Sequence, residues 1–297
     1  MRVSHPIDQL IHDLEHERAK DYWGRVKRFK AQEAERRKAG KAHEKKQLEY
    51  MRAVGIKPGT IEKEQEEDSR ELKSYLKQTR PPLVSRRSRS AEDAKHTTRW
   101  TAKLGGLGGL IPPISVFQLP PDPSEVLPTN PSKIKIKDVS QGSGTGWWAT
   151  AHVPVPPVDV VFGFTPGQSA RYSFTAAFAF HGFLILKADD GTFTHKDAGV
   201  TLDFSLNAFQ IVDRGWKSFP RPIDREGDNI NEFDNFDKQL LNFSDSQDFR
   251  EGEPVVVTAR IEISASASGS GSHAEINFAD GDANFIQPLY LWVSPPP

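Results

Sequence analysis

The chain has 297 residues, with 39 Lys and Arg against 40 Asp and Glu, and it contains no Cys. The absence of Cys excludes disulfide frameworks, thiol catalysis and thiolate-bound zinc or iron–sulfur clusters. No run of about 18 apolar residues occurs, and charges alternate with aliphatic residues over the first twenty positions, so we expect neither a membrane span nor a signal peptide. A cytoplasmic location, or a place in a virion-like or extracellular particle, fits these observations.

The near-zero net charge conceals two halves of opposite sign. Residues 1–103 carry 26 Lys and Arg against 17 Asp and Glu, a net +9, whereas residues 104–297 carry 13 against 23, a net −10. Seventeen of the 18 Phe also follow residue 104. Opposite charges attract over a Debye length of about 10 Å, so the division bears on partners and on self-association.

Residues 1–82 are predicted to form a basic, helical assembly or oligomerisation segment. A helix is expected from Pro6 to the Lys57-Pro58-Gly59 sequence, and a second, acidic helix capped by Thr60 is expected to stop at Pro81-Pro82. Apolar side chains recur at three- and four-residue spacing, the pattern of one helical face. The candidate assembly residues on this stripe are Ile7, Leu10, Ile11, Leu14, Tyr22, Val26, Phe29, Leu48 and Met51.

This apolar stripe is too narrow to stabilise a long helix in isolation. From Ala31 to Gln47 the only apolar residues are alanines, among charges that can pair at i,i+4. The helix therefore needs a partner, and three are possible: its own second helix folded back as a hairpin, the same helix of another copy in a coiled coil, or another protein.

Residues 83–132 are predicted to be a Pro/Gly-rich linker or docking arm. Their prolines favour extended chain outside any sheet, although apolar residues such as Leu110, Val116 and Phe117 indicate that part of the arm docks. A basic cluster of Arg86, Arg87 and Arg89 is the candidate contact to nucleic acid, whose phosphates are bound without regard to sequence.

Residues 133–297 change to a two-residue apolar period, which predicts half-buried strands. About nine strands are expected, near residues 133, 147, 158, 170, 183, 198, 255, 273 and 284. Residues 255–267 and 274–278 are interpreted as a hairpin joined by the Gly269–Ser272 turn, and Pro288 predicts a sheet edge or a bulge. The fold class is therefore α+β and multidomain, ending in an antiparallel, jelly-roll-like β-sandwich.

Several residues in the sandwich are candidate ligand-binding positions. Residues 213–254 are interpreted as a wide acidic crossover loop in which carboxylates could hold Ca²⁺. Trp147 and Trp148 could stack on a glycan, and His181, His195 and Asp197 could approach one another across a hairpin turned at Asp190-Gly191. The candidate metal ligands are Asp224, Asp228, Asp234 and Asp237.

Three functions from different classes follow. The first is a non-enzymatic structural protein that builds a homo-oligomer or larger particle, with itself or another protein of the same assembly. The alternative is a carbohydrate- or receptor-binding sandwich on a helical stalk, and the second alternative is a coat-type protein whose basic arm contacts nucleic acid, the less favoured partner. No catalytic motif occurs, so we expect no enzyme and, calcium aside, no cofactor.

Overall fold

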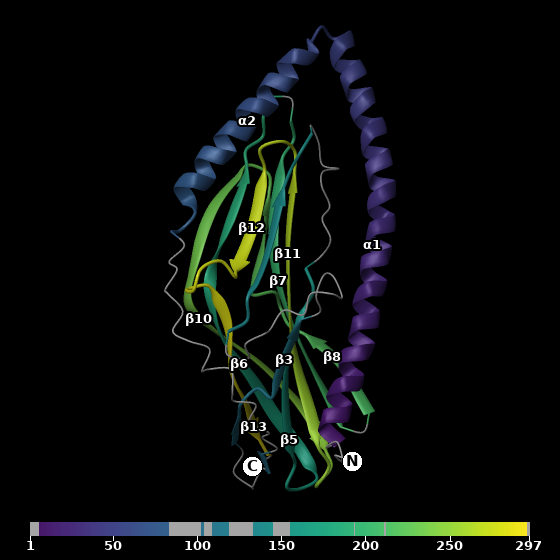
Figure 1. Ribbon diagram of the computed structural model, residues 1–297, viewed down its shortest axis with the longest axis vertical. Coiled ribbons are helices and arrows are strands. Elements are labelled where there is room, and N and C mark those ends of the chain that lie inside the picture. Colours follow the sequence, from purple (N-terminus) through teal and green to yellow (C-terminus); the bar gives the residue numbers. More distant parts are fainter. Residues whose placement is uncertain are drawn as a thin grey trace.

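The computed structural model describes residues 6–82, 102–103, 109–118, 133–144, 155–192, 194–210 and 212–295. This part contains two helices, followed by thirteen strands that form two sheets packed face to face (Figure 1). The helices are α1 (Pro6–Ala53) and α2 (Pro58–Thr79), and the strands are β1 (Ala102–Lys103), β2 (Gly109–Ile111), β3 (Ser115–Gln118), β4 (Ile136–Gln141), β5 (Val158–Thr165), β6 (Ala170–Ala188), β7 (Asp197–Gln210), β8 (Val212–Ser218), β9 (Ile223–Gly227), β10 (Ile230–Phe249), β11 (Val255–Ser268), β12 (His273–Phe278) and β13 (Phe285–Ser294).

The strands divide between two sheets. Sheet A has the order β1-β5-β11-β7-β8, with β3 also beside β5 and β9 also beside β7. Sheet B has the order β2-β13-β6-β12-β4, with β10 along the other edge of β6. Apart from the short parallel pair β1–β5, the strand pairs are antiparallel. The predicted β-sandwich is therefore confirmed, whereas its jelly-roll order and the three-part division of the chain stay predictions.

The core is built from the inward faces of the long strands, as the two-residue period predicts. Alternate side chains of β6, β7 and β11 are fully buried between the sheets. Phe204 of β7 and Phe243 of β10 join the two sheets directly, because their rings stack 3.5 Å apart at an interplanar angle of 7°. The aromatic half of the sequence thus forms a single core.

The expected acidic crossover loop over residues 213–254 is wrong, because this region forms β8, β9 and β10. β10 is 20 residues long and pairs with nearly all of β6. Its outward positions are mostly polar or charged, which suits a strand at the edge of a sheet but weakens the apolar alternation that identifies strands. This explains why the sequence pattern predicts a loop where β10 forms an edge strand beside β6.

The expected hairpin at Gly269–Ser272 is also wrong. β11 lies in sheet A and β12 in sheet B, so the turn carries the chain from one sheet to the other. Likewise, the segment after Asp190 connects β6 of sheet B to β7 of sheet A and does not close a hairpin. Periodicity identifies strands but does not specify which strands pair, because pairing depends on contacts distant in sequence.

The arm takes more part in the sheets than its prolines predict. β2 pairs with β13 and β3 pairs with β5, so these residues lie in the sheets and not outside them, while the bounds and role of the arm stay predictions. Pro288 lies at a register shift between β13 and β6, which confirms the predicted bulge.

The two helices end where the sequence predicts, with one difference at the second helix. α2 begins at Pro58, without a side-chain cap, so Thr60 is not its N-cap. Gly55 adopts a φ of 86° in the elbow between the helices, a conformation that glycine tolerates. Figure 1 shows the helices diverging from this elbow onto different sides of the sandwich. Neither of these helices has the stretch of apolar sequence that crossing a bilayer requires.

The Phe204–Phe243 stack predicts the effect of two matched substitutions in β10. Phe243→Ala removes a ring that is 6% exposed and should destabilise the fold by about 3–5 kcal/mol. Phe233→Ala removes a ring that is 41% exposed on the same strand and should cost much less. Urea unfolding of both variants tests this, and equal losses would contradict the assignment of Phe243 to the core.

Candidate functional site

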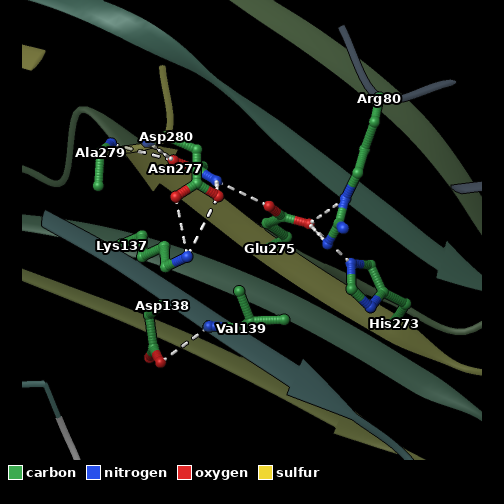
Figure 2. Close-up of polar contacts among 9 residues, drawn as sticks. All are labelled: Arg80, Lys137, Asp138, Val139, His273, Glu275, Asn277, Ala279 and Asp280. Carbon is green, nitrogen blue, oxygen red and sulfur yellow. Dashed lines mark hydrogen bonds and ion pairs between the residues drawn. The ribbon is translucent and has the colours of Figure 1, made fainter. Parts of the chain in front are cut away.

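The most concentrated polar structure in the described chain lies on the outer face of β12. Ala274, Ile276 and Phe278 point into the core, and His273, Glu275 and Asn277 point to the opposite face. All three polar side chains are nevertheless buried. Figure 2 shows them in a row of hydrogen bonds that runs from Arg80, just after α2, to Lys137 of β4.

Glu275 is the centre of this row. Arg80 donates to its Oε2 from Nε at 3.2 Å and from Nη2 at 2.6 Å, and Asn277 Nδ2 donates to its Oε1 at 2.8 Å. Burial alone would raise the pKa of the Glu275 carboxyl, but the hydrogen bonds from His273, Asn277 and Arg80 outweigh burial and lower this pKa to about 2. Glu275 is therefore a buried, ionised carboxylate.

The ionised carboxylate determines the proton position on His273. Nε2 of His273 lies 3.1 Å from Oε2 of Glu275, and because the carboxylate can only accept, Nε2 carries the proton. Nδ1 of His273 is buried and makes no hydrogen bond within the described residues. The ring is completely shielded from solvent, so it orients Glu275 and does not present a base to a substrate.

Asn277 extends the row to the turn after β12. Its Oδ1 accepts hydrogen bonds from the backbone N–H groups of Ala279 and Asp280, and its Nδ2 also donates to Asp280 at 2.9 Å. Lys137 in turn donates to both carboxylate oxygens of Asp280, at 2.9 and 3.1 Å. Burial raises the pKa of Asp280, and these donors from Lys137 and Asn277 lower it on balance.

α2 makes further polar contacts with the end of the sandwich that it covers. Asp68 forms a buried ion pair with Lys196 at 2.9 Å, in the connection between β6 and β7. The Lys187 ammonium lies 5.0 Å from the centre of the Tyr75 ring, a cation–π distance. A Cβ on Gly271 would lie 2.6 Å from the Asp68 Cβ, so this turn needs glycine to let α2 approach.

A cleft of about 220 Å³ adjoins the row of hydrogen bonds. Its walls come from the end of the helical segment, β6, β10 and the turn between β12 and β13. Burial lowers the pKa of His181 in this cleft, while the charge of Asp237 opposes that shift. The cleft can hold a small polar group, and its lining residues include Pro81, Pro82, His181, Asn235, Asp237 and Asp280.

α1 contacts the sandwich through one face near its start. Tyr22 and Val26, one turn apart, are buried, and Arg25 forms an ion pair at 3.0 Å with Glu262 of β11. Among the residues from Lys27 to Glu49 whose burial is described, only Gly40 is buried. The elbow then exposes Tyr50 and Val54.

The candidate assembly residues differ in how far they are buried. Tyr22, Val26 and Met51 are buried, and Phe29 and Leu48 are partly buried. Ile7, Leu10, Ile11 and Leu14 lie in α1, but their side chains are outside the described part. The apolar stripe therefore gains part of its cover from the chain's own fold, and assembly through it stays a prediction.

The four candidate metal ligands are not gathered into a site. Asp224 lies on β9 beside Arg221, Asp228 lies in the turn before β10, and Asp234 and Asp237 lie on β10. No group of three His, Asp or Glu residues within the described residues could hold a metal ion. The part of the expected loop that contains the four carboxylates forms β9 and the start of β10, which belong to different sheets.

The histidine cluster is likewise separated. His181 stacks on Phe285 with ring centres 4.5 Å apart, whereas His195 pairs with Asp190 at 3.4 Å near the far end of β6. Seven residues of strand from His181 to Ala188 span about 23 Å, which excludes a shared site. The other candidates, Trp147, Trp148, Arg86, Arg87 and Arg89, lie outside the described residues.

The sequence analysis missed His273, Glu275, Asn277 and their partner Arg80. The signal was present, because three polar residues alternate with three apolar ones over residues 273–278. Such alternation predicts a solvent-facing polar side. Only the placement of the helical segment, 195 residues away in sequence, shows that this side is covered.

Comparisons with known proteins add little to this geometry. No family model matches the chain, and no curated protein matches it. A solved structure titled "CBM4 structure and function" is similar over 45% of this chain and 71% of that chain, at 10% identity and a TM-score of 0.13. A likeness at this level carries no argument about fold or function.

The pKa of Glu275 predicts an acid-dependent loss of stability. Its folded-state pKa of about 2 lies below the ordinary 4.5, so its contribution is complete above pH 4.5 and is lost as the pH falls toward 2. This contribution is worth about 3 kcal/mol. Glu275→Gln should destabilise the protein at pH 7, and the difference from the parent in urea unfolding should shrink between pH 5 and pH 2.

The matched control is Glu262→Gln, which breaks the exposed pair with Arg25. Exposed ion pairs contribute about 0–1 kcal/mol, so this variant should stay close to the parent at every pH. A pH-independent deficit in Glu275→Gln would contradict the assignment of a buried ionised carboxylate.

Proposed function

We propose that the protein is a non-enzymatic structural protein that assembles with copies of itself into an oligomer or larger particle. The observation that supports this best is that most of the described side chains of α1 between Lys27 and Glu49 are exposed. This part of the helix is rich in charged residues and extends for about 35 Å. Helices of this kind are stabilised by contacts with other domains or subunits more than by their own sequence.

Charge complementarity identifies the surface that such a helix would contact. Residues 22–46 carry ten Lys and Arg against three Glu, whereas β10 carries five Asp and Glu against one Lys. The pair of Arg25 with Glu262 shows α1 making one contact of this type within the chain. The exposed basic part of α1 therefore suits the acidic edge of sheet B in a neighbouring copy.

Charge reversal on α1 tests the proposal. Lys27, Lys30 and Lys41 are exposed, so Lys27→Glu with Lys30→Glu and Lys41→Glu should leave folding intact and reduce the mass of the assembly. Multi-angle light scattering at low and high salt measures that mass. The parent should lose mass as salt is added, and the triple variant should already be smaller at low salt.

A matched variant in β10 is expected to strengthen the assembly. Lys238→Glu makes the acidic edge strand more negative, so it should raise the salt concentration needed to dissociate the parent assembly. A parent that is monomeric at both salt concentrations would refute the proposed function. Equal effects of both variants would show that the assembly does not depend on this charge pairing.

A second candidate function, carbohydrate or receptor binding, is favoured by one face of sheet B. Tyr290 and Trp292 alternate along β13 and are both exposed, and Trp292 lies opposite the exposed Leu110 of β2. On the neighbouring strands, Thr175 and Ser244 hydrogen-bond at 2.7 Å beside Trp292. Aromatic rings next to hydroxyl groups form a surface on which sugar rings can stack.

Single alanine variants test this second candidate. Trp292→Ala should weaken retention on insoluble cellulose or chitin by about tenfold or more, since a stacked ring contributes about 1.5 kcal/mol. Trp216→Ala is the matched control, because Trp216 is similarly exposed but lies on β8 of sheet A. Absence of binding to either polysaccharide, or equal losses in the two variants, would contradict this function.

A further inference from the structure

The interface between α2 and the sandwich differs in chemistry from the core. The described chain has 15 buried polar or charged residues, and nine of them lie in the strand ends, turn and connection that α2 covers. By contrast, Ile61 and Leu72 are the only buried apolar residues among the described side chains of α2. The nine are Lys187, Thr194, Lys196, Ser268, Ser270, Ser272, His273, Glu275 and Asn277.

Two ion pairs hold this interface together. Asp68 meets Lys196 near the middle of the helix, and Arg80 meets Glu275 just after its last turn. Polar interfaces of this kind resemble those between transiently associated domains, because the separated surfaces are readily hydrated. The contacts are also specific, because both ion pairs must form in register.

The chain between α2 and the sandwich is long enough for α2 to pack on the sandwich of another copy. Residues 83–101 separate Pro82 from the first described strand, β1, and 19 residues can span up to about 65 Å when extended. This exceeds the usual connection of four to six residues by a wide margin. The helical segment could therefore reach a neighbouring sandwich without unfolding its own.

From these observations we infer that α2 is exchanged between two copies of the chain. In the exchanged dimer, α2 of each copy covers β12 of the other, and the pairs Asp68–Lys196 and Arg80–Glu275 form between copies. Such domain swapping needs no new interface, because it reuses contacts that one chain already makes. It also carries α1 to the second sandwich. This inference rests on the proposed self-assembly and names the contact that joins the copies.

Two single-cysteine variants test the exchange directly, since the chain has no Cys of its own. Ser270 Oγ lies 3.4 Å from the backbone oxygen of Gln65, so Gln65→Cys and Ser270→Cys place thiols at the same contact. The two variants are mixed in urea at a concentration that unfolds the protein and are then refolded together by removal of the urea. A short bifunctional thiol reagent then joins thiols that lie together.

Exchange predicts covalent dimers in the mixture and none in either variant alone. In a random mixture about half of the dimers contain both variants, which sets the upper limit of the yield. The double variant Gln65→Cys with Ser270→Cys is the control, because it shows that the reagent spans this contact. Internal bridging in the double variant without dimers in the mixture would overturn the exchange.

Light scattering of the same samples separates the two proposals. An oligomer without covalent dimers means that the copies assemble through another surface, which refutes the exchange and leaves the proposed function in place. A monomer without covalent dimers refutes both. Arg80→Ala and Lys196→Ala are then added to both single-cysteine variants. Loss of the covalent dimers on this addition supports exchange through these ion pairs.

Discussion

A buried carboxylate requires compensating partners. In this protein one of those partners, Arg80, directly follows α2 and so ties the end of the helical segment to the sandwich. Glu275 is 1% exposed and ionised, so it must accept hydrogen bonds from donors in its surroundings. Two of those donors, His273 and Asn277, come from its own strand, and the third, Arg80, comes from the residue after α2. The position of α2 on the sandwich therefore depends on this charge as well as on the buried side chains of Ile61 and Leu72.

The rest of the helical segment follows from this attachment. Arg80 and Asp68 are held on one side of the sandwich and Arg25 on the other. The elbow between α1 and α2 lies beyond the end of the sheets, as Figure 1 shows. α1 then has a long, highly charged stretch in which most of the described side chains are exposed. Both proposals start from this arrangement: an exposed basic helix available to a neighbour, and a polar helix interface that can form within or between copies.

Two regions of the outer face of sheet B differ in chemistry. The end under α2 is polar, buried and held by ion pairs, whereas the face formed by β13 and β2 exposes aromatic rings and uncharged hydroxyl groups. Attraction between charged groups weakens in salt, but ring stacking does so much less. Salt dependence therefore distinguishes contacts through the helices from contacts through the aromatic face.

The sequence by itself determined the helices, the boundary between them and most long strands, because helical and strand periodicities are local. It indicated a sandwich, since long strands such as Val255–Ser268 alternate cleanly. Only the tertiary structure decided that Gly269–Ser272 joins two sheets, that residues 230–249 form an edge strand, and that Glu275 meets Arg80. Those features depend on contacts between residues far apart in the chain, and no local pattern specifies which distant side chain covers a polar strand face.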